Sequence, residues 1–107
     1  MSWQDTIIKA HTMVTESVSH MERLKSDRYF VWQEDGANEL EADNIHTLRA
    51  VTGTTDLYTK MEFDPWKDKF EAALDETGIS WYINTIQYET ETGFTHYEWR
   101  WEVLDYA

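Results

Sequence analysis

Apolar residues recur along this chain at helical and at strand spacings, and the two periods predict its elements. From the first tryptophan to Met21 they return every three or four positions, which is the spacing of one helical face. This apolar stripe consists of Trp3, Ile7, Ala10, Val14, Val18 and Met21. Ser2 precedes the stripe and is a favourable N-cap. We therefore expect an amphipathic helix from Trp3 to Met21 that packs on another layer.

A second helix is marked by its ends as well as by its stripe. Asp64 can cap it, Pro65 suits the first helical position, and Gly78 can close it. Its apolar stripe consists of Trp66, Phe70, Ala73 and Leu74. The stripes of both helices are expected to pack on the aromatic face of the last two strands.

Two strands are expected between the helices. Residues 28–33 are aromatic and β-branched, which favours a short strand. Residues 34–44 are acidic and carry a glycine, so we expect a loop there. Residues 45–60 then form a long strand, in which Gly53 marks a bulge or a bend.

The last two predicted strands, residues 79–89 and 95–106, form a hairpin around Thr92 and Gly93. A two-residue turn at that point pairs Tyr88 with Tyr97, Ile86 with Trp99, Asn84 with Trp101 and Tyr82 with Val103. These residues share one face, and a slip by one residue would mix it with the polar face. On the polar face, Glu89 is expected opposite His96 as a surface pair.

The resulting order is helix, strand, strand, helix, strand, strand. We expect an α+β fold in which an antiparallel sheet carries both helices on one face. The chain has 107 residues, which suffices for one core, so residues 1–107 are expected to form one domain. With 41% hydrophobic and 15% aromatic residues, it does not have the composition of a disordered protein.

Charge and composition exclude several classes of function. The net charge is −12, from 21 acidic and 9 basic residues, which opposes general affinity for nucleic acid and for anionic membranes. No apolar run is long enough for a membrane span, and the first residues do not look like a secretory signal. The chain has no cysteine, which excludes disulfides, thiolate metal sites and a thiol nucleophile.

Motifs for catalysis or metal binding are missing from the sequence. The four glycines are scattered, so there is no phosphate loop and no dinucleotide fingerprint. A calcium loop centred on Gly53 would place Leu48 at the first ligand position, where it cannot coordinate. Asp43 and His46 could approach a metal together, but two residues are too few for a site. We expect no cofactor, no metal and no enzymatic activity.

Apolar residues exceed what one buried face needs. On the predicted outer face of the last hairpin, large side chains cluster, and two aromatic residues share one face of the first strand. Unless the first helix or a terminus covers them, they form an exposed patch of the kind that marks an interaction surface. The candidate interface residues are Phe30, Trp32, Trp81, Ile83, Leu104 and Tyr106.

Four segments give the chain a resemblance to a known family: residues 29–36 (YFVWQEDG), 42–44 (ADN), 53–60 (GTTDLYTK) and 87–99 (QYETETGFTHYEW). In pattern and order they are similar to short tail-terminator, tail-completion or head–tail joining proteins. Such proteins are encoded by tailed phages and prophages of low-GC Gram-positive bacteria. The resemblance extends from Tyr29 to Val103 and includes no catalytic signature.

This resemblance implies an α+β subunit that assembles into a ring, commonly a hexamer, at the head-proximal end of the tail tube. The ring would stop tube polymerisation and present a surface to the head connector. The implied partners are copies of the chain itself, the tail-tube protein and the head-connector protein. The implied location is the host bacterial cytoplasm during assembly and then the virion. An acidic channel would let DNA pass without specific binding.

Two other functions remain open from the sequence. An acidic inhibitor or DNA mimic could occupy the basic site of a partner protein, and the net charge of −12 suits it. It would be a monomer or dimer with rows of carboxylates. The third hypothesis is a small binding module with an aromatic pocket, although aromatic residues of the core would show the same spacing in the sequence.

Overall fold

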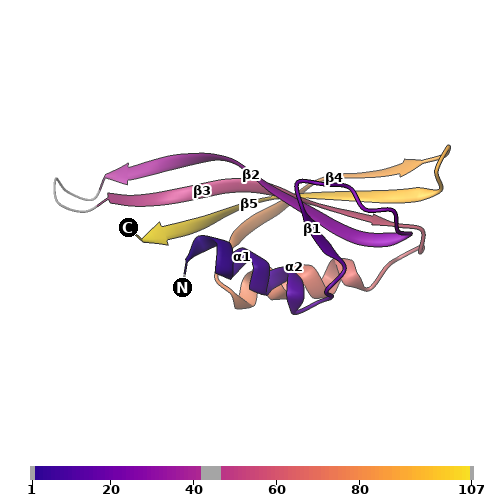
Figure 1. Cartoon of the computed structure of the whole chain (residues 1–107), viewed down its shortest axis with the longest axis horizontal. Coiled ribbons are helices and arrows are strands. Elements are labelled where there is room, and N and C mark those ends of the chain that lie inside the picture. Colours follow the sequence, from indigo (N-terminus) through magenta and orange to yellow (C-terminus); the bar gives the residue numbers. More distant parts are fainter. Residues whose placement is uncertain (1, 42–46, 107) are drawn as a thin grey trace.

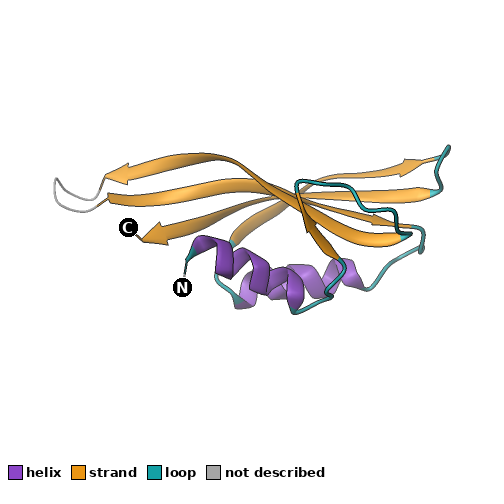
Figure 2. Cartoon of the chain, in the orientation of Figure 1, coloured by secondary structure: helices purple, strands orange, loops and turns teal. Residues whose placement is uncertain are grey.

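Two helices lie on one face of a five-stranded sheet (Figure 1, Figure 2). The computed structural model describes the backbone of residues 2–41 and 47–106 and the side chains of residues 2–37 and 49–105. The helices are α1 (Trp3–Thr12) and α2 (Trp66–Glu76). The strands are β1 (Val18–His20), β2 (Arg28–Glu41), β3 (Thr47–Thr59), β4 (Ser80–Glu89) and β5 (Phe94–Tyr106), in the spatial order β1-β2-β3-β5-β4.

The predicted α+β class is confirmed, but the sheet is mixed rather than wholly antiparallel, because β1 runs parallel to β2. The predicted first helix is too long: α1 ends at Thr12, and Val18 belongs to β1. Thr15, Ser17 and Val18 are weak helix formers, which explains the early end. Val14 and Val18 still pack against the core, although neither is in the helix. Their apolar character therefore continued the helical spacing in the sequence beyond the end of α1.

The predicted loop over residues 34–44 is wrong for residues 34–41, because β2 continues through Glu41. Residues 42–46, with Asp43 and His46, lie outside the described part. A bulge occurs near Gly53, as expected, but in the partner strand between Glu34 and Gly36. Gly53 itself allows a close approach, since an added Cβ would come within 2.5 Å of the Trp101 ring and the Gln33 carbonyl oxygen.

The predicted register of the last hairpin is wrong, because the turn is longer than two residues. Glu89 pairs with Phe94, which encloses four residues, and Ile86 therefore faces Tyr97 rather than Trp99. A second irregularity follows between Ile83 and Thr85. This bulge reverses the alternation in β4, so that Ile83 faces Trp99 and Trp81 faces Trp101.

The core fills the space between the helices and the sheet. Phe70 on α2 lies between two aromatic residues of the sheet, with ring centroids 5.0 Å from Phe30 and 5.0 Å from Trp99. Ile7 and Ala10 of α1 are buried in the same cluster. A smaller cluster lies on the other face of the sheet and consists of Tyr29, Val31 and Tyr58, with Phe94 packed beside them.

Candidate interaction surfaces

The residues predicted to form one exposed patch are dispersed in the structure. Phe30 and Trp32 are buried beneath the helices, so the prediction that they lie exposed is wrong. Their face of β2 packs on the helical layer. Both faces of this strand carry apolar residues, so the sequence pattern did not show which face lies inside. Trp32 contacts Trp3 of α1 at 6.4 Å between centroids.

Trp81 and Ile83 were expected on the outer face of the last hairpin, and this too is wrong. The β4 bulge turns both toward the helices, where they are half-buried against the core. The Trp81 indole Nε1 donates to Asp75 of α2 at 2.7 Å, which places it at the helix end. Leu104 is 44% exposed. Tyr106 lies in β5, but its side chain is outside the described part.

Exposed apolar side chains gather instead at the N-terminal end of α2. Phe63, Ile86 and Tyr88 are 86%, 56% and 65% exposed, and we call them the α2 end surface. Beside them is a hollow of about 370 Å³ lined by Phe63, Asp64, Lys67, Asp68, Ile86 and Tyr97. Ile86 and Tyr88 lie on the helix side of β4, across from Tyr97 and Thr95 respectively.

The lengths of the two elements explain why this surface is uncovered. The 11 residues of α2 extend about 16 Å, because a helix rises about 1.5 Å per residue. The 10 residues of β4 extend about 33 Å at about 3.3 Å per residue. The helix therefore covers only half of the strand, and Ile86 and Tyr88 lie beyond its first turn. Sequence periodicity assigned both residues to the core, since it contains no information on element lengths in space.

The segment that carries Phe63 is held firmly in place. Asp64, whose side chain is buried, accepts hydrogen bonds from Arg28 Nε at 2.8 Å and Arg28 Nη2 at 2.5 Å. It also accepts from the Trp66 backbone N–H at 2.9 Å, as an N-cap would. Burial works to raise the pKa of Asp64, but these hydrogen bonds outweigh it and leave the pKa below its usual value.

Phe63 has a backbone conformation that is unusual for its residue type. Its φ is +53°, in the left-handed region, which costs a residue with a Cβ about 1–2 kcal/mol. The adjacent Arg28–Asp64 ion pair fixes the chain on one side of it. In this strained conformation the aromatic ring of Phe63 projects into solvent, so it makes little packing that could compensate for the strain.

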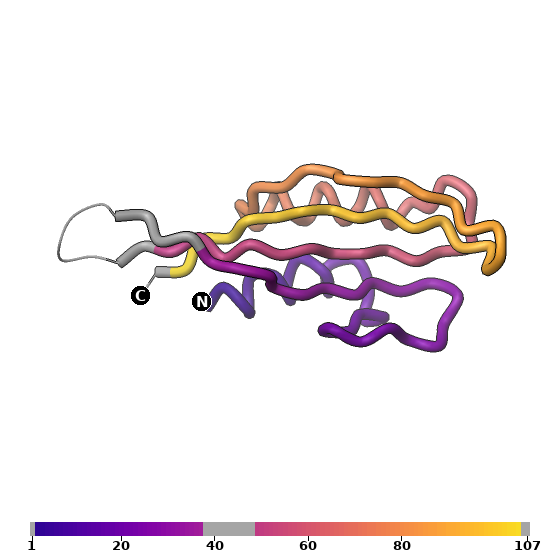
Figure 3. Tube along the Cα trace, turned by 90° about the horizontal axis from the view of Figure 1, so that it is seen from above, coloured from indigo at the N-terminus to yellow at the C-terminus, as the bar shows by residue number. Residues whose placement is uncertain are grey.

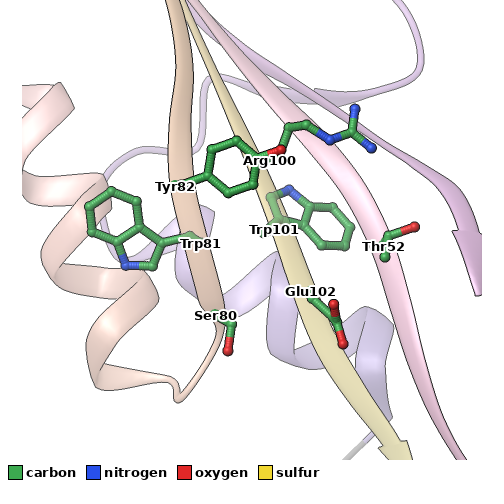
Figure 4. Close-up of a pocket in the computed structure, with 7 residues that line it drawn as sticks. All are labelled: Thr52, Ser80, Trp81, Tyr82, Arg100, Trp101 and Glu102. Atoms are coloured by element: carbon green, nitrogen blue, oxygen red, sulfur yellow. The ribbon is translucent and has the colours of Figure 1, made fainter. Parts of the chain in front are cut away.

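A second hollow of about 310 Å³ lies over β3, β5 and β4 (Figure 4). The residues that line it are Thr52, Ser80, Trp81, Tyr82, Arg100, Trp101 and Glu102. Arg100 is engaged by Asp35 at 3.0 Å. In the described part of the chain, no group of three or more potential ligand side chains could hold a metal ion.

The buried histidine has structural partners. His11 is fully buried, and burial lowers its pKa to about 4. His11 Nδ1 lies 2.7 Å from the Ile7 carbonyl oxygen, which only accepts, so Nδ1 carries the proton. Nε2 then accepts from the Thr55 hydroxyl at 2.9 Å, and Thr55 Oγ1 accepts from Trp101 Nε1 at 2.9 Å. This chain of hydrogen bonds joins α1 to β3 and β5.

The expected pairing of His96 with Glu89 is wrong. His96 lies opposite Gln87 in β4 because of the longer turn, and its Nε2 lies 2.6 Å from Asp56 Oδ1 on β3. Its ring stacks on Tyr58, with centroids 4.4 Å apart. The pair lies on the outer face of the sheet with both side chains largely covered.

The two borders of the sheet are open along much of their length (Figure 3). Within the described residues, β4 has β5 as its only strand neighbour. On the opposite border, β1 pairs with only residues 30–32 of β2, so the rest of that side is without a described partner strand. Such borders expose backbone donors and acceptors that another strand can use.

Comparison with known proteins identifies the fold rather than a sequence family. No family model matches the chain, and the search of curated proteins found no match. Among solved structures, the chain is similar to one in "Virion of native gene transfer agent (GTA) particle", with a TM-score of 0.56 and 6% identity. The alignment covers 99% of this chain and 92% of that chain. None of the described helices is long and apolar enough to cross a membrane.

Proposed function

We propose, on the premise of this shared fold, that the protein is a structural subunit of a phage-like particle. The observation that carries the proposal is the extent of the likeness, which covers 99% of this chain and 92% of a chain in a gene transfer agent virion. The resemblance of residues 29–103 to tail-terminator and head–tail joining proteins points to the same class. Its location would be the virion, after assembly in the host cytoplasm.

The specific role that we propose is a tail-terminator-like ring at the head-proximal end of the tail tube. A ring needs two different surfaces on each subunit that meet head to tail. The borders at β4 and β2 meet this requirement, since strand addition could join β4 of one copy to β2 of the next. β4 contains neither lysine nor proline, the residues that commonly block such pairing.

The same proposal accommodates the net charge and a sequence that carries no catalytic motif. A net charge of −12 would let DNA pass a ring without specific binding. His11, Arg28 and Asp64 support the fold through mutual hydrogen bonds with neighbouring elements. We therefore propose a role without enzymatic activity or cofactor, in contact with the tail-tube and head-connector proteins.

A charge-introduction experiment at the β4 border tests the ring. The double variant Tyr82→Glu/Gln87→Glu places two acids on exposed positions of β4, facing away from the helices. The outer face of the β2 border carries the acid Asp35, beside Arg100, so the added acids should be repelled by a neighbouring copy. Sedimentation velocity should show loss of the oligomer in this variant.

The matched control is Ile8→Glu, an exposed position on α1, in the helical layer rather than in a border strand. It should leave the oligomer intact. An oligomer that survives the β4 double variant, or one that the α1 control disrupts equally, would contradict strand addition at this border. Circular dichroism would establish that each variant is folded.

A further inference from the structure

We propose that the α2 end surface binds a segment of another protein that presents an aliphatic or aromatic side chain flanked by lysine or arginine. This inference goes beyond the ring, because the surface lies on the helix side of the sheet rather than in the plane of its borders. Its parts are the exposed side chains of Phe63, Ile86 and Tyr88 and the hollow that Tyr97 helps to line.

The apolar part of the surface is suited to an inserted side chain. The hollow of about 370 Å³ is lined by Tyr97, which is buried, and by Phe63 and Ile86, which are exposed. Large exposed apolar groups that gather at one place on a domain are uncommon unless a partner covers them. A single large apolar side chain inserted here would cover both Phe63 and Ile86.

The surface is also prepared for binding before any partner arrives. Asp64, next to Phe63, is fixed by Arg28 and by the first turn of α2, and the Arg28 guanidinium lies 3.7 Å from the Trp66 ring centre. The backbone beside Phe63 therefore has little conformational freedom left to lose on binding, which favours affinity. Binding of the Phe63 ring to a partner would explain why this residue has a left-handed φ.

The charges around the surface select a basic partner. Glu62 precedes Phe63, and Asp68 is 87% exposed at its side chain. Lys67 is engaged by Glu71 at 3.2 Å and by Asp68 at 3.6 Å, which leaves the rim acidic. Lysine or arginine beside the inserted side chain would complement this rim and accelerate association.

The same charges argue against a second copy as the occupant. The chain carries a net charge of −12. Three of its four arginines, at 28, 49 and 100, are already in ion pairs with Asp64, Asp105 and Asp35 respectively. The fourth, Arg23, is engaged by Tyr29 and the Tyr58 ring. A second copy would therefore bring mainly like charge to this rim.

A peptide selection tests the proposal with the full-length chain. Random linear peptides displayed on a surface are selected for binding, and the best binder is synthesised and measured by fluorescence anisotropy. We expect an aliphatic or aromatic residue flanked by lysine or arginine. Binding should weaken about tenfold or more in Phe63→Ser and in Asp68→Lys. The Asp68→Lys effect should shrink as salt is added.

The matched controls are Met13→Ser and Glu16→Lys, which make the same kinds of change at exposed positions near the end of α1. They should leave peptide affinity unchanged. The proposal is overturned if no peptide is selected, if the peptides lack basic residues, or if Phe63→Ser binds as tightly as the wild type. It is also overturned if Phe63→Ser abolishes self-association, since the occupant would then be a second copy. Failure of the ring itself would be seen separately, as a wild-type monomer that still binds the peptide.

Discussion

Protonation of His11 should make the stability of this protein depend on pH between about 4 and 6.5. The side chain is fully buried, and burial lowers its pKa from 6.5 to about 4 in the folded state. In the unfolded chain the imidazole takes up a proton below about pH 6.5, whereas the folded protein keeps it neutral. Unfolding therefore binds a proton in this window, and stability falls as the pH decreases.

The size of the effect follows from the two pKa values. A difference of about 2.5 units, at about 1.4 kcal/mol per unit, gives a loss of about 3 kcal/mol on going from pH 6.5 to 4. Above pH 6.5 this contribution is fully present and constant. Since domains of this size are stable by about 5–15 kcal/mol, the loss should be readily measurable.

The variant His11→Phe isolates this contribution. The His11 ring lies 4.7 Å from that of Phe70 and 5.7 Å from that of Phe30, so a phenyl ring has aromatic neighbours. It cannot titrate, and Thr55 keeps its hydrogen bond from Trp101. Urea unfolding followed by tryptophan fluorescence at several pH values should show the slope in the wild type and a much smaller one in the variant. Equal slopes in the two proteins, or a wild type with flat stability from pH 6.5 to 4.5, would refute the reasoning.

Two further predictions concern stability. Gly53→Ala should destabilise the fold by about 1–3 kcal/mol in thermal melts, because the new Cβ meets the Trp101 ring at 2.3 Å. Gly36→Ala, with its nearest neighbour at 3.2 Å, should cost less, and the opposite order would contradict the close-approach argument. Arg28→Gln should cost about 3–5 kcal/mol in urea unfolding, because it leaves the Asp64 carboxylate buried without its ion pair. A loss below about 1 kcal/mol would mean that the carboxylate finds another partner or is protonated at little cost.

Local signals in the sequence were sufficient for α2 and for the buried face of β5. Asp64 and Gly78 mark the ends of the helix by chemistry that acts over a few residues. In β5, Tyr97, Trp99, Trp101 and Val103 alternate with polar residues and are all buried. Here, one-dimensional periodicity and three-dimensional burial coincide.

Features that depend on contacts between distant residues could not be predicted from the sequence. Residues 34–41 form a strand but show no apolar alternation, so their acidic composition suggested a loop. The bulge in β4 reverses which side chains face the helices, and it turned the predicted interface residues Trp81 and Ile83 inward. The α2 end surface is exposed because α2 is shorter than β4, and the sequence pattern does not show how far one element extends along another.

The measurement that tests the central claim most directly is the absolute mass of the full-length protein by light scattering after size exclusion, over a concentration series. Negative-stain images of the same fractions would show the shape of any assembly. The account predicts a ring, with a mass at or rising towards that of a hexamer, and a monomer mass of 12.8 kDa at high dilution. A protein that remains monomeric at every concentration, both alone and with tail tubes added, would contradict it.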